Sequence, residues 1–310
     1  MKFTEEHLPT LRPRAAQRYN TSIDRLAESF EGLYLDQLGS AKLAEFEAKR
    51  RNDGVSAPTI RRDLACLSSM FGCCIDWEWL DVNPVSAYLR RRKKRGALRE
   101  APPRRRYLTH AEEAAILEEA SPIVAKAIAF AIDTGLRKEE MFSLRRSQIR
   151  DGRVIVHAEN TKGGRHGREV PLLPRAAEIS ARLPAHLQTD FLFVNPRRRV
   201  PGERRRKADR FNHLDRGLKA ACRRAKVEDV RWHDLRRTCG CRLLQDHRMP
   251  IEQVSKWLGH ASIAQTQAAY AFLEVEQLER TLEERRQAQV RAGKIKRAPA
   301  QSSAHKAADK

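Results

Sequence analysis

Four short polar segments interrupt apolar stretches between residues 134 and 260, and a lone tyrosine follows the last of them. Their residue types suit chemistry on a phosphate, because arginine binds two non-bridging oxygens and histidine donates hydrogen bonds or accepts a proton near neutral pH. A lysine can protonate a leaving oxygen, and a tyrosine can be a nucleophile that holds a covalent intermediate. The segments are residues 134–140, 161–165, 232–238 and 258–260, and the tyrosine is Tyr270.

No metal or nucleotide pattern accompanies these segments in the sequence. The neighbouring carboxylates have no metal-ligand spacing, and no Walker-type glycine loop is present. Cys239 and Cys241 lack a second ligand pair and lie in an apolar helical pattern, which favours buried thiols over a zinc site. Phosphoryl transfer here would therefore be metal-free, with fixed cations stabilising the charge of the transition state. Each residue alone has an ordinary structural explanation, so the argument depends on their order and spacing.

The order of these segments resembles that of the tyrosine recombinases of the phage-integrase type, over about residues 11–282. Thr-Gly-x-Arg-x-x-Glu stands at 134–140, a hairpin lysine before Arg-x-Val-Pro-Leu at 162 and 168–172, His-x-Leu-Arg at 233–236 and Leu-Gly-His at 258–260. Two departures occur. Arg237 replaces the family's usual histidine at a position that is not catalytic, and ten positions rather than the usual nine separate His260 from Tyr270.

The resemblance implies a DNA breaking and rejoining enzyme that needs no cofactor, since a 3′-phosphotyrosyl bond keeps the phosphodiester energy. Two arginines and His260 would hold the phosphate, His233 would act as a base, and Lys162 would protonate the leaving 5′-oxygen. Glu140 would orient the first arginine from the next helical turn. The implied catalytic set is Arg137, Lys162, His233, Arg236, His260 and the nucleophile Tyr270, supported by Glu140.

Apolar spacing predicts an all-helical N-terminal part. Apolar residues over 19–30 and again over 60–71 recur at intervals of four, three and four, as on one face of a helix. Ser40 is expected to cap a helix between them. The resemblance identifies this bundle with the family's core-binding, SAM-like domain. Only about ten residues precede it, so we expect no separate arm-binding domain.

The remaining sequence predicts a second, mainly helical domain with a small antiparallel hairpin. Thr109 with Glu112 forms a capping box, and the apolar helix over 123–132 is expected to end at Gly135. Strands at 153–156 and 168–172 flank a turn at 160–164. Helices resume near residue 175, and one is expected to start with Pro250 and end at Gly259. We therefore predict a mostly α fold with a helical bundle at 1–89, a basic linker at 90–106, a catalytic domain at 107–290 and a tail of disorder-prone composition at 291–310.

The charge of the chain points to a polyanionic partner. Its 61 Lys+Arg outnumber 40 Asp+Glu, giving +21, and three strips at 90–106, 197–210 and 284–310 hold +9, +6 and +6 of that excess. The three strips correspond to a connector, a loop and a tail. Strips of this kind suit contacts with the phosphates of double-stranded DNA, and the DNA affinity is then expected to depend strongly on salt. The candidate DNA contacts are Arg91, Arg92, Lys93, Arg104, Arg105, Arg198 and Arg205.

Other partners and the compartment follow from the same observations. No apolar run approaches the ~20 residues of a membrane span, and no secretory signal is visible. We therefore expect a cytoplasmic, nucleoid-associated prokaryotic protein without a membrane partner. Recombination of two duplexes implies a homotetramer on DNA, with a monomer or weak oligomer off it, and is compatible with accessory DNA-bending or directionality proteins. An apolar stripe at Phe272, Val275, Leu278 and Leu282 suits a helix that docks on a neighbour or on its own domain.

Several functions remain open at this point. The first is a recombinase that integrates and excises a mobile element, and the second is a host recombinase that resolves chromosome dimers. A DNA-binding protein that no longer cleaves is a third, supported only by the longer spacing before Tyr270. A type IB topoisomerase shares the chemistry and would relax any supercoiled plasmid without a specific site.

Overall fold

The computed structural model describes residues 2–96, 98, 104–158, 167–198 and 207–273. The chain divides into two compact units, Met1–Pro102 and Pro103–Lys310, each described here by itself. Among the described residues, no helix has both the length and the apolar character that a bilayer crossing requires. All six cysteines are free thiols, and Cys239 and Cys241 are buried.

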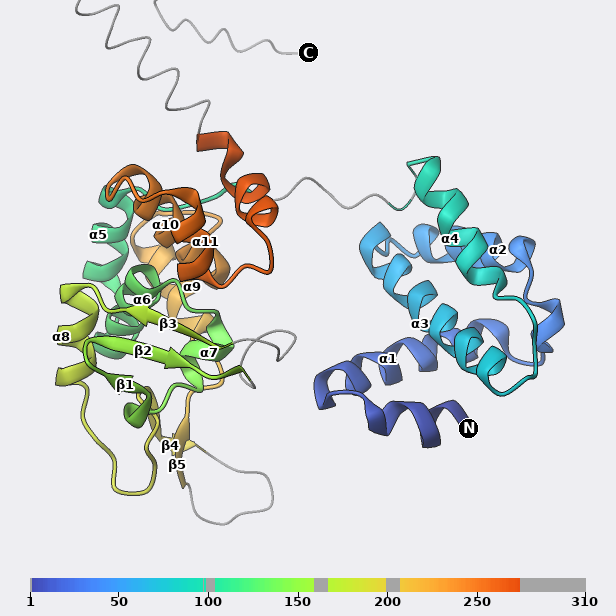
Figure 1. Ribbon diagram of the computed structural model, residues 1–310, viewed down its shortest axis with the longest axis horizontal. Helices are drawn as coiled ribbons and strands as arrows, with labels where there is room; N and C mark the ends of the chain where they lie inside the picture. Colours follow the sequence, from blue (N-terminus) through green and yellow to red (C-terminus); the bar gives the residue numbers. More distant parts are fainter. Residues whose placement is uncertain (1, 97, 99–103, 159–166, 199–206, 274–310) are drawn as a thin grey trace, which may run out of the picture. The chain divides into compact units, whose positions relative to one another are not determined.

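The described part of the N-terminal unit is helical (Figure 1, blue to cyan). Its elements are η1 (Phe3–His7), η2 (Leu8–Thr10), α1 (Pro13–Phe30), η3 (Leu35–Gln37), α2 (Ser40–Asn52), α3 (Ala57–Asp76) and α4 (Pro84–Lys94). Helix α3 packs against α1, α2 and α4, and its Ile60 and Leu64 are fully buried. The rings of Phe30 and Phe46, 5.4 Å apart, join α1 to α2.

Two details of this unit differ from the prediction. Ser40 is the first residue of α2 rather than its cap, because Gly39 occupies the N-cap position. Helix α4 runs to Lys94, so the first residues of the predicted 90–106 linker are helical. Its start is fixed by Asn83, whose side-chain oxygen accepts a hydrogen bond from the Ser86 amide at 3.0 Å.

The second unit combines helices with two small antiparallel sheets (Figure 1). Its elements are α5 (His110–Glu119), α6 (Pro122–Thr134), α7 (Lys138–Phe142), η4 (Arg146–Gln148), β1 (Ile149–Arg150), β2 (Arg153–Val156), β3 (Arg168–Pro171), α8 (Pro174–Arg182), β4 (Val194–Arg198), β5 (Lys207–Arg210), α9 (Asp215–Arg224), α10 (Trp232–Gln245) and α11 (Ile251–Leu258). A further helical segment spans 263–273, where the described residues end. The mostly α fold class is confirmed.

Helix α6 forms the centre of the second unit. Every residue over 127–134 is buried, and α5, α8, α9 and α10 pack around the helix. A helix that is apolar on all sides is expected inside a core. The predicted capping box starts α5, with Thr109 and Glu112 bonded reciprocally at 3.2 and 3.0 Å.

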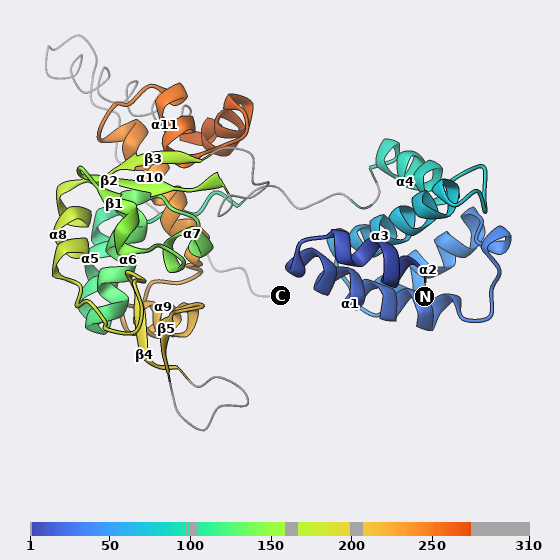
Figure 2. The ribbon, with the colours of Figure 1, turned by 60° about the horizontal axis from the view of Figure 1, so that its bottom comes forward.

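The predicted hairpin is confirmed in β2 and β3, and its turn lies outside the described residues. The first sheet has the order β1-β2-β3, with Val154 opposite Val170 and Val156 opposite Arg168. Figure 2 shows β3 beside α11, which it contacts. The strip at 197–210, expected to be a loop, instead contributes to the pair β4–β5. Its charged residues lack the apolar alternation that would have indicated strands.

Candidate active site

The C-terminal end of α11 gathers three arginines from different parts of the chain. Three successive carbonyl oxygens accept hydrogen bonds from them: Trp257 O from Arg168 Nε at 3.1 Å, Leu258 O from Arg236 Nη2, and Gly259 O from Arg137 Nη2 at 2.9 Å. The last carbonyls of a helix lack partners within the helix and carry partial negative charge, so they attract cations. The Leu-Gly-His segment therefore positions arginines that belong to other motifs.

Two glycines allow this close convergence. Gly135 ends α6 and Gly259 ends α11, both with left-handed backbones at φ of 62° and 65°. A Cβ atom at Gly259 would lie 2.7 Å from Cδ of Arg168, and one at Gly135 would lie 2.7 Å from Cδ2 of Leu258. A side chain at either position would push the converging segments apart. The prediction that Gly135 and Gly259 end helices is confirmed. Pro250, predicted as the first residue of its helix, is instead the N-cap of α11.

Glu140 is the buried counter-charge of the site. Its Oε1 accepts from Arg137 Nη1 at 2.8 Å and from Arg168 Nη1 at 3.1 Å, and its Oε2 accepts from the Arg137 amide at 2.8 Å and from Arg168 Nη2 at 2.7 Å. Burial would raise the pKa of Glu140, but the hydrogen bonds and charge of Arg168, then the bonds from Arg137, lower it to about 2. The carboxylate is therefore ionised at any physiological pH.

Arg236 is the most deeply buried arginine of the three, at 4% exposure. Its Nη1 donates to Gly135 O at 2.7 Å. Burial, followed by repulsion from Arg137 and Arg168, lowers its pKa to about 10, so it still carries a charge at neutral pH. Three guanidinium groups around the single carboxylate of Glu140 leave two positive charges in excess. Mutual repulsion of this kind is relieved when an anion such as a phosphate binds between the groups.

The two predicted histidines lie beside these arginines and are neutral near pH 7. Burial, then the charges of Arg236 and Arg137, lower the pKa of His260 to about 4. Its Nδ1 lies 2.8 Å from the hydroxyl of Thr266, a fully buried residue. His233 is exposed at the start of α10, yet desolvation by the surrounding protein and the charge of Arg236 also lower its pKa.

Tyr270 is held away from solvent in this structure. It is 4% exposed, and its hydroxyl packs against α10 where a Cβ atom at Gly240 would lie only 2.0 Å from Oη. Burial, and then the adjacent Cys241, raise the pKa of the phenol above its ordinary value, which the charge of Arg236 only partly offsets. The structure thus brings Tyr270 within the electrostatic reach of Arg236 but keeps its oxygen covered.

Residues 106–277, more than half of the chain, match the family model described as the phage integrase family. The chain belongs to the phage integrase family. A shufflon-specific DNA recombinase from Escherichia coli is 26% identical over 253 residues, which cover 79% of this chain and 58% of that protein. The chain spans about half the length of the curated relatives it matches.

Solved integrase structures share the fold of this family member. A lambda integrase (75–356) dimer bound to a COC′ core site has a TM-score of 0.67 at 17% identity, covering 86% of this chain and 92% of that one. A lambda integrase tetramer bound to a Holliday junction has a TM-score of 0.63 at 18% identity, covering 83% and 72%. At such identities the likeness shows the fold.

Among the integrase-type motifs, the structure brings five predicted residues and Glu140 into one region. They are Arg137, Arg236, His233, His260 and, covered beside α10, Tyr270. Lys162 lies outside the described residues, although β3, which follows it, borders α11. The stripe at Phe272–Leu282 is described only to residue 273, where the ring of Phe272 packs on Tyr107 of the same unit, 5.9 Å between centroids.

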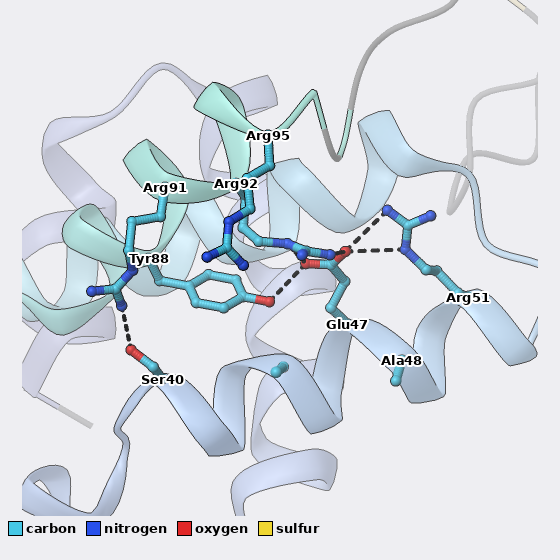
Figure 3. Close-up of a pocket in the computed structure, with 9 residues that line it drawn as sticks. Ser40, Glu47, Ala48, Arg51, Tyr88, Arg91, Arg92 and Arg95 are labelled. Atoms are coloured by element: carbon cyan, nitrogen blue, oxygen red, sulfur yellow. Dashed lines mark hydrogen bonds and ion pairs between the residues drawn. The ribbon is translucent and has the colours of Figure 1, made fainter.

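Arg91 and Arg92, two of the three candidate DNA contacts of the N-terminal unit, border a groove of about 510 Å³ between α2 and α4 (Figure 3). Arg91 donates to the Ser40 hydroxyl, and Lys93 is exposed. Arg92 pairs with Glu47, whose carboxylate also accepts from Tyr88 at 2.7 Å and from Arg51 at 3.1 Å. The groove is thus lined by arginines around one buried acid.

The remaining candidate DNA contacts, Arg104, Arg105, Arg198 and Arg205, differ in their surroundings. Arg104 is engaged within its own unit, because Asp234 and Asp229 accept hydrogen bonds from it at 2.8 and 2.6 Å. It therefore anchors the end of the predicted linker to the start of α10 instead of presenting a free charge. Arg105 is exposed, Arg198 belongs to β4, and Arg205 lies outside the described residues.

Sequence reasoning missed three members of the site. Arg168 was noted only as part of a strand motif, Thr266 as part of a spacer, and Gly240 as part of a cysteine pair. A weak signal existed for Arg168, since it shares a strand face with the buried Val170, and an arginine drawn into a core needs an acid. For Thr266 and Gly240 no local signal existed, because their partners are distant side chains.

Proposed function

We propose that this chain is a tyrosine-type site-specific DNA recombinase that cuts and rejoins DNA through a 3′-phosphotyrosyl intermediate. The observation that carries the proposal is the arrangement of Arg137, Arg168 and Arg236 on successive carbonyls of α11, with two positive charges in excess of Glu140. Neutral histidines and a tyrosine border this centre. A family of DNA integrases and recombinases supplies the context.

Arg137 and Arg236 bind the scissile phosphate and stabilise its transition state. Arg137 stays accessible to a phosphate, since its side chain is 28% exposed, while Glu140 holds its Nη1 and Gly259 O holds its Nη2. Arg236 is held rigidly by two carbonyls and adds its charge from below the surface. Donors fixed in advance at low dielectric stabilise the pentavalent phosphorane most effectively, because they need not reorganise during the reaction.

The proton movements follow from the protonation states. Tyr270 Oη forms a bond to phosphorus as the bond from phosphorus to the 5′-oxygen breaks. The phenolic proton passes to His233, which is neutral and able to accept it, and the leaving 5′-oxygen takes a proton from Lys162. In the tautomer whose Nδ1 accepts from the Thr266 hydroxyl, 2.8 Å away, His260 would carry its proton on Nε2 and donate a hydrogen bond from it to a phosphate oxygen. Attack by a 5′-hydroxyl on the phosphotyrosine reverses the steps.

Tyr270 must leave its position beside Gly240 before it attacks. Its oxygen is covered and its pKa is raised, so the buried phenol is a poor nucleophile. Binding of DNA at the arginines is the step that would favour an exposed tyrosine, since a phosphate relieves the repulsion among the guanidinium groups.

The DNA contacts of the N-terminal unit position the duplex rather than read its sequence. Arg91 and Arg92, with their neighbour Arg95, offer charges to backbone phosphates along the groove between α2 and α4. We also infer assembly as a tetramer on two recombining sites, which the lambda integrase tetramer on a Holliday junction supports by its fold. The biological role we propose is integration and excision of a mobile element.

A suicide substrate tests this function. The site is first selected from a random duplex library, and a nicked copy is incubated with the full-length protein and run on a denaturing gel. We expect a covalent complex with the wild type and none with Tyr270→Phe. Tyr107→Phe is the matched control, because it also removes one hydroxyl from the same unit. Wild-type protein that binds the selected site but never forms the complex contradicts the proposal.

A further inference from the structure

Arg168 is a buried arginine whose hydrogen bonds are all directed inside the protein. Its side chain is 9% exposed, and its two Nη atoms bond both oxygens of Glu140, at 3.1 and 2.7 Å. Its Nε donates to the carbonyl of Trp257 at 3.1 Å, and its Cδ packs at the position that a Gly259 side chain would occupy. Arg168 is therefore not available as a phosphate contact, unlike the more exposed Arg137.

The position of Arg168 connects three segments that each supply a proposed catalytic group. It opens β3, the strand that follows the Lys162 hairpin, and it is paired with Val156 of β2. Through Glu140 it reaches α7, whose N-cap is Arg137. Through Trp257 O it reaches the end of α11, three residues before His260.

The shared carboxylate gives Arg168 an electrostatic effect on Arg137. Oε1 of Glu140 accepts from both arginines, at 2.8 Å from Arg137 and 3.1 Å from Arg168. One negative charge divided between two guanidinium groups neutralises neither, so Arg137 keeps positive charge for a phosphate. Without Arg168, the carboxylate would pair with Arg137 alone, and its burial would push its pKa upward from about 2.

We propose that Arg168 is a positioning residue for DNA cleavage, which acts through Glu140 to orient Arg137 and leave its charge available to a phosphate, while holding the start of β3 against α11. The proposal rests on the proposed recombinase function. It assigns a role to the strand arginine of the Arg-x-Val-Pro-Leu motif without giving it a contact to DNA.

The test measures the rate of covalent-complex formation on the nicked site from pH 5 to 8, together with the Kd for the intact site. We expect Arg168→Gln to slow cleavage about 10–100-fold at pH 7.5 with little change in Kd, as for other residues that orient catalytic groups. Below pH 7 its rate should fall more steeply than that of the wild type, because protonation of Glu140 becomes accessible. The control is Arg153→Gln, which removes an exposed arginine of the same sheet that is paired with Glu169 at 2.9 Å.

A comparison of single and double variants of Arg168 and Glu140 distinguishes a positioning role of Arg168 from general damage to the fold. The double variant Arg168→Gln, Glu140→Gln should be no slower than Glu140→Gln alone, because both changes remove one interaction. Arg168→Lys should recover only part of the rate, since a lysine cannot bond both carboxylate oxygens and the Trp257 carbonyl together. If Arg168→Gln does not fold, Arg168→Lys serves for the same comparison.

Two results overturn the inference. If the wild type cleaves and Arg168→Gln matches Arg153→Gln in rate and pH profile, Arg168 has no positioning role while the recombinase function stands. The same conclusion follows if the effects of Arg168→Gln and Glu140→Gln simply multiply. If the wild type forms no covalent complex at all, the proposed function fails and the inference fails with it.

Discussion

The phenolic oxygen of Tyr270 packs against the backbone of Gly240, at a point where a Cβ atom would come within 2.0 Å of it. Gly240 lies in the middle of α10, four residues after Arg236 and between two buried cysteines. A glycine inside a helix is normally unfavourable, so its presence here fits the need to accommodate the tyrosine. The proposed nucleophile therefore packs on the helix that carries Arg236, one of the proposed phosphate-binding arginines.

Replacing Gly240 by alanine should destabilise the protein, against the usual trend. Glycine to alanine inside a helix ordinarily stabilises by about 0.5–1 kcal/mol. At position 240 the new methyl group would collide with Tyr270, so we expect a loss of roughly 1–3 kcal/mol in the free energy of unfolding. Denaturant titration measures it. Gly72→Ala in α3, where the added atom meets nothing within 4 Å, is the control and should stabilise. An equal increase in the free energy of unfolding for both variants would contradict the packing of Tyr270 on Gly240.

The histidines predict how stability depends on pH. The pKa of His260 falls from 6.5 in the unfolded chain to about 4 in the fold, so below pH 6.5 the unfolded state binds protons that the folded state does not. Stability is therefore highest above pH 6.5 and declines as the pH falls toward 4, by roughly 1–3 kcal/mol for this residue. Urea titrations of wild type and His260→Gln between pH 4.5 and 7.5 measure the difference. A decline of the same size in both proteins would refute this assignment.

The contact between Thr266 and His260 should matter more for cleavage than for folding. Thr266→Val keeps the shape of a fully buried side chain but removes the hydroxyl that lies 2.8 Å from Nδ1. We expect a loss of about 0.5–1.5 kcal/mol in stability and a several-fold slower cleavage, because the ring loses the partner that fixes its tautomer. Thr266→Ser should restore the rate. Unchanged cleavage by Thr266→Val would show that the tautomer is fixed by another group.

The groove of the N-terminal unit predicts a measurable salt dependence. Arg95 lines it beside Arg91 and Arg92, as Figure 3 shows, and is exposed. Arg95→Gln should weaken DNA binding similarly for all sequences and reduce the slope of log K against log salt by about 1. Arg25→Gln, an exposed arginine of α1 outside the groove, is the control. If both variants keep the wild-type slope, the groove does not contact phosphates.

Local signals in the sequence predicted most helices and the motif residues of the site. Apolar spacing placed α1, α3 and α6, and the glycines at 135 and 259 marked helix ends that the structure confirms. These features depend on neighbours within one or two turns, which a single sequence contains. The order of the motifs along the chain is also informative, because it can be compared directly with that of a known family.

Contacts between distant residues could not be predicted. Arg104 looked like one more cation of the linker, but it bonds Asp234, 130 positions away. Glu140 was expected to orient Arg137, whereas its second partner, Arg168, depends on how β3 meets α7. The covered state of Tyr270 depends on the packing of the 263–273 helical segment on α10. Charge patterns reveal that cations are present, but only the fold decides which remain free.

Tyr270 as the nucleophile is the central claim to test. The covalent complex formed on the nicked site can be digested with trypsin and nuclease, and the nucleotide-bearing peptide located by mass spectrometry. We predict one modified peptide, residues 257–280, with the phosphodiester on Tyr270. A DNA adduct on any other residue, or efficient strand exchange by Tyr270→Phe, would contradict the account.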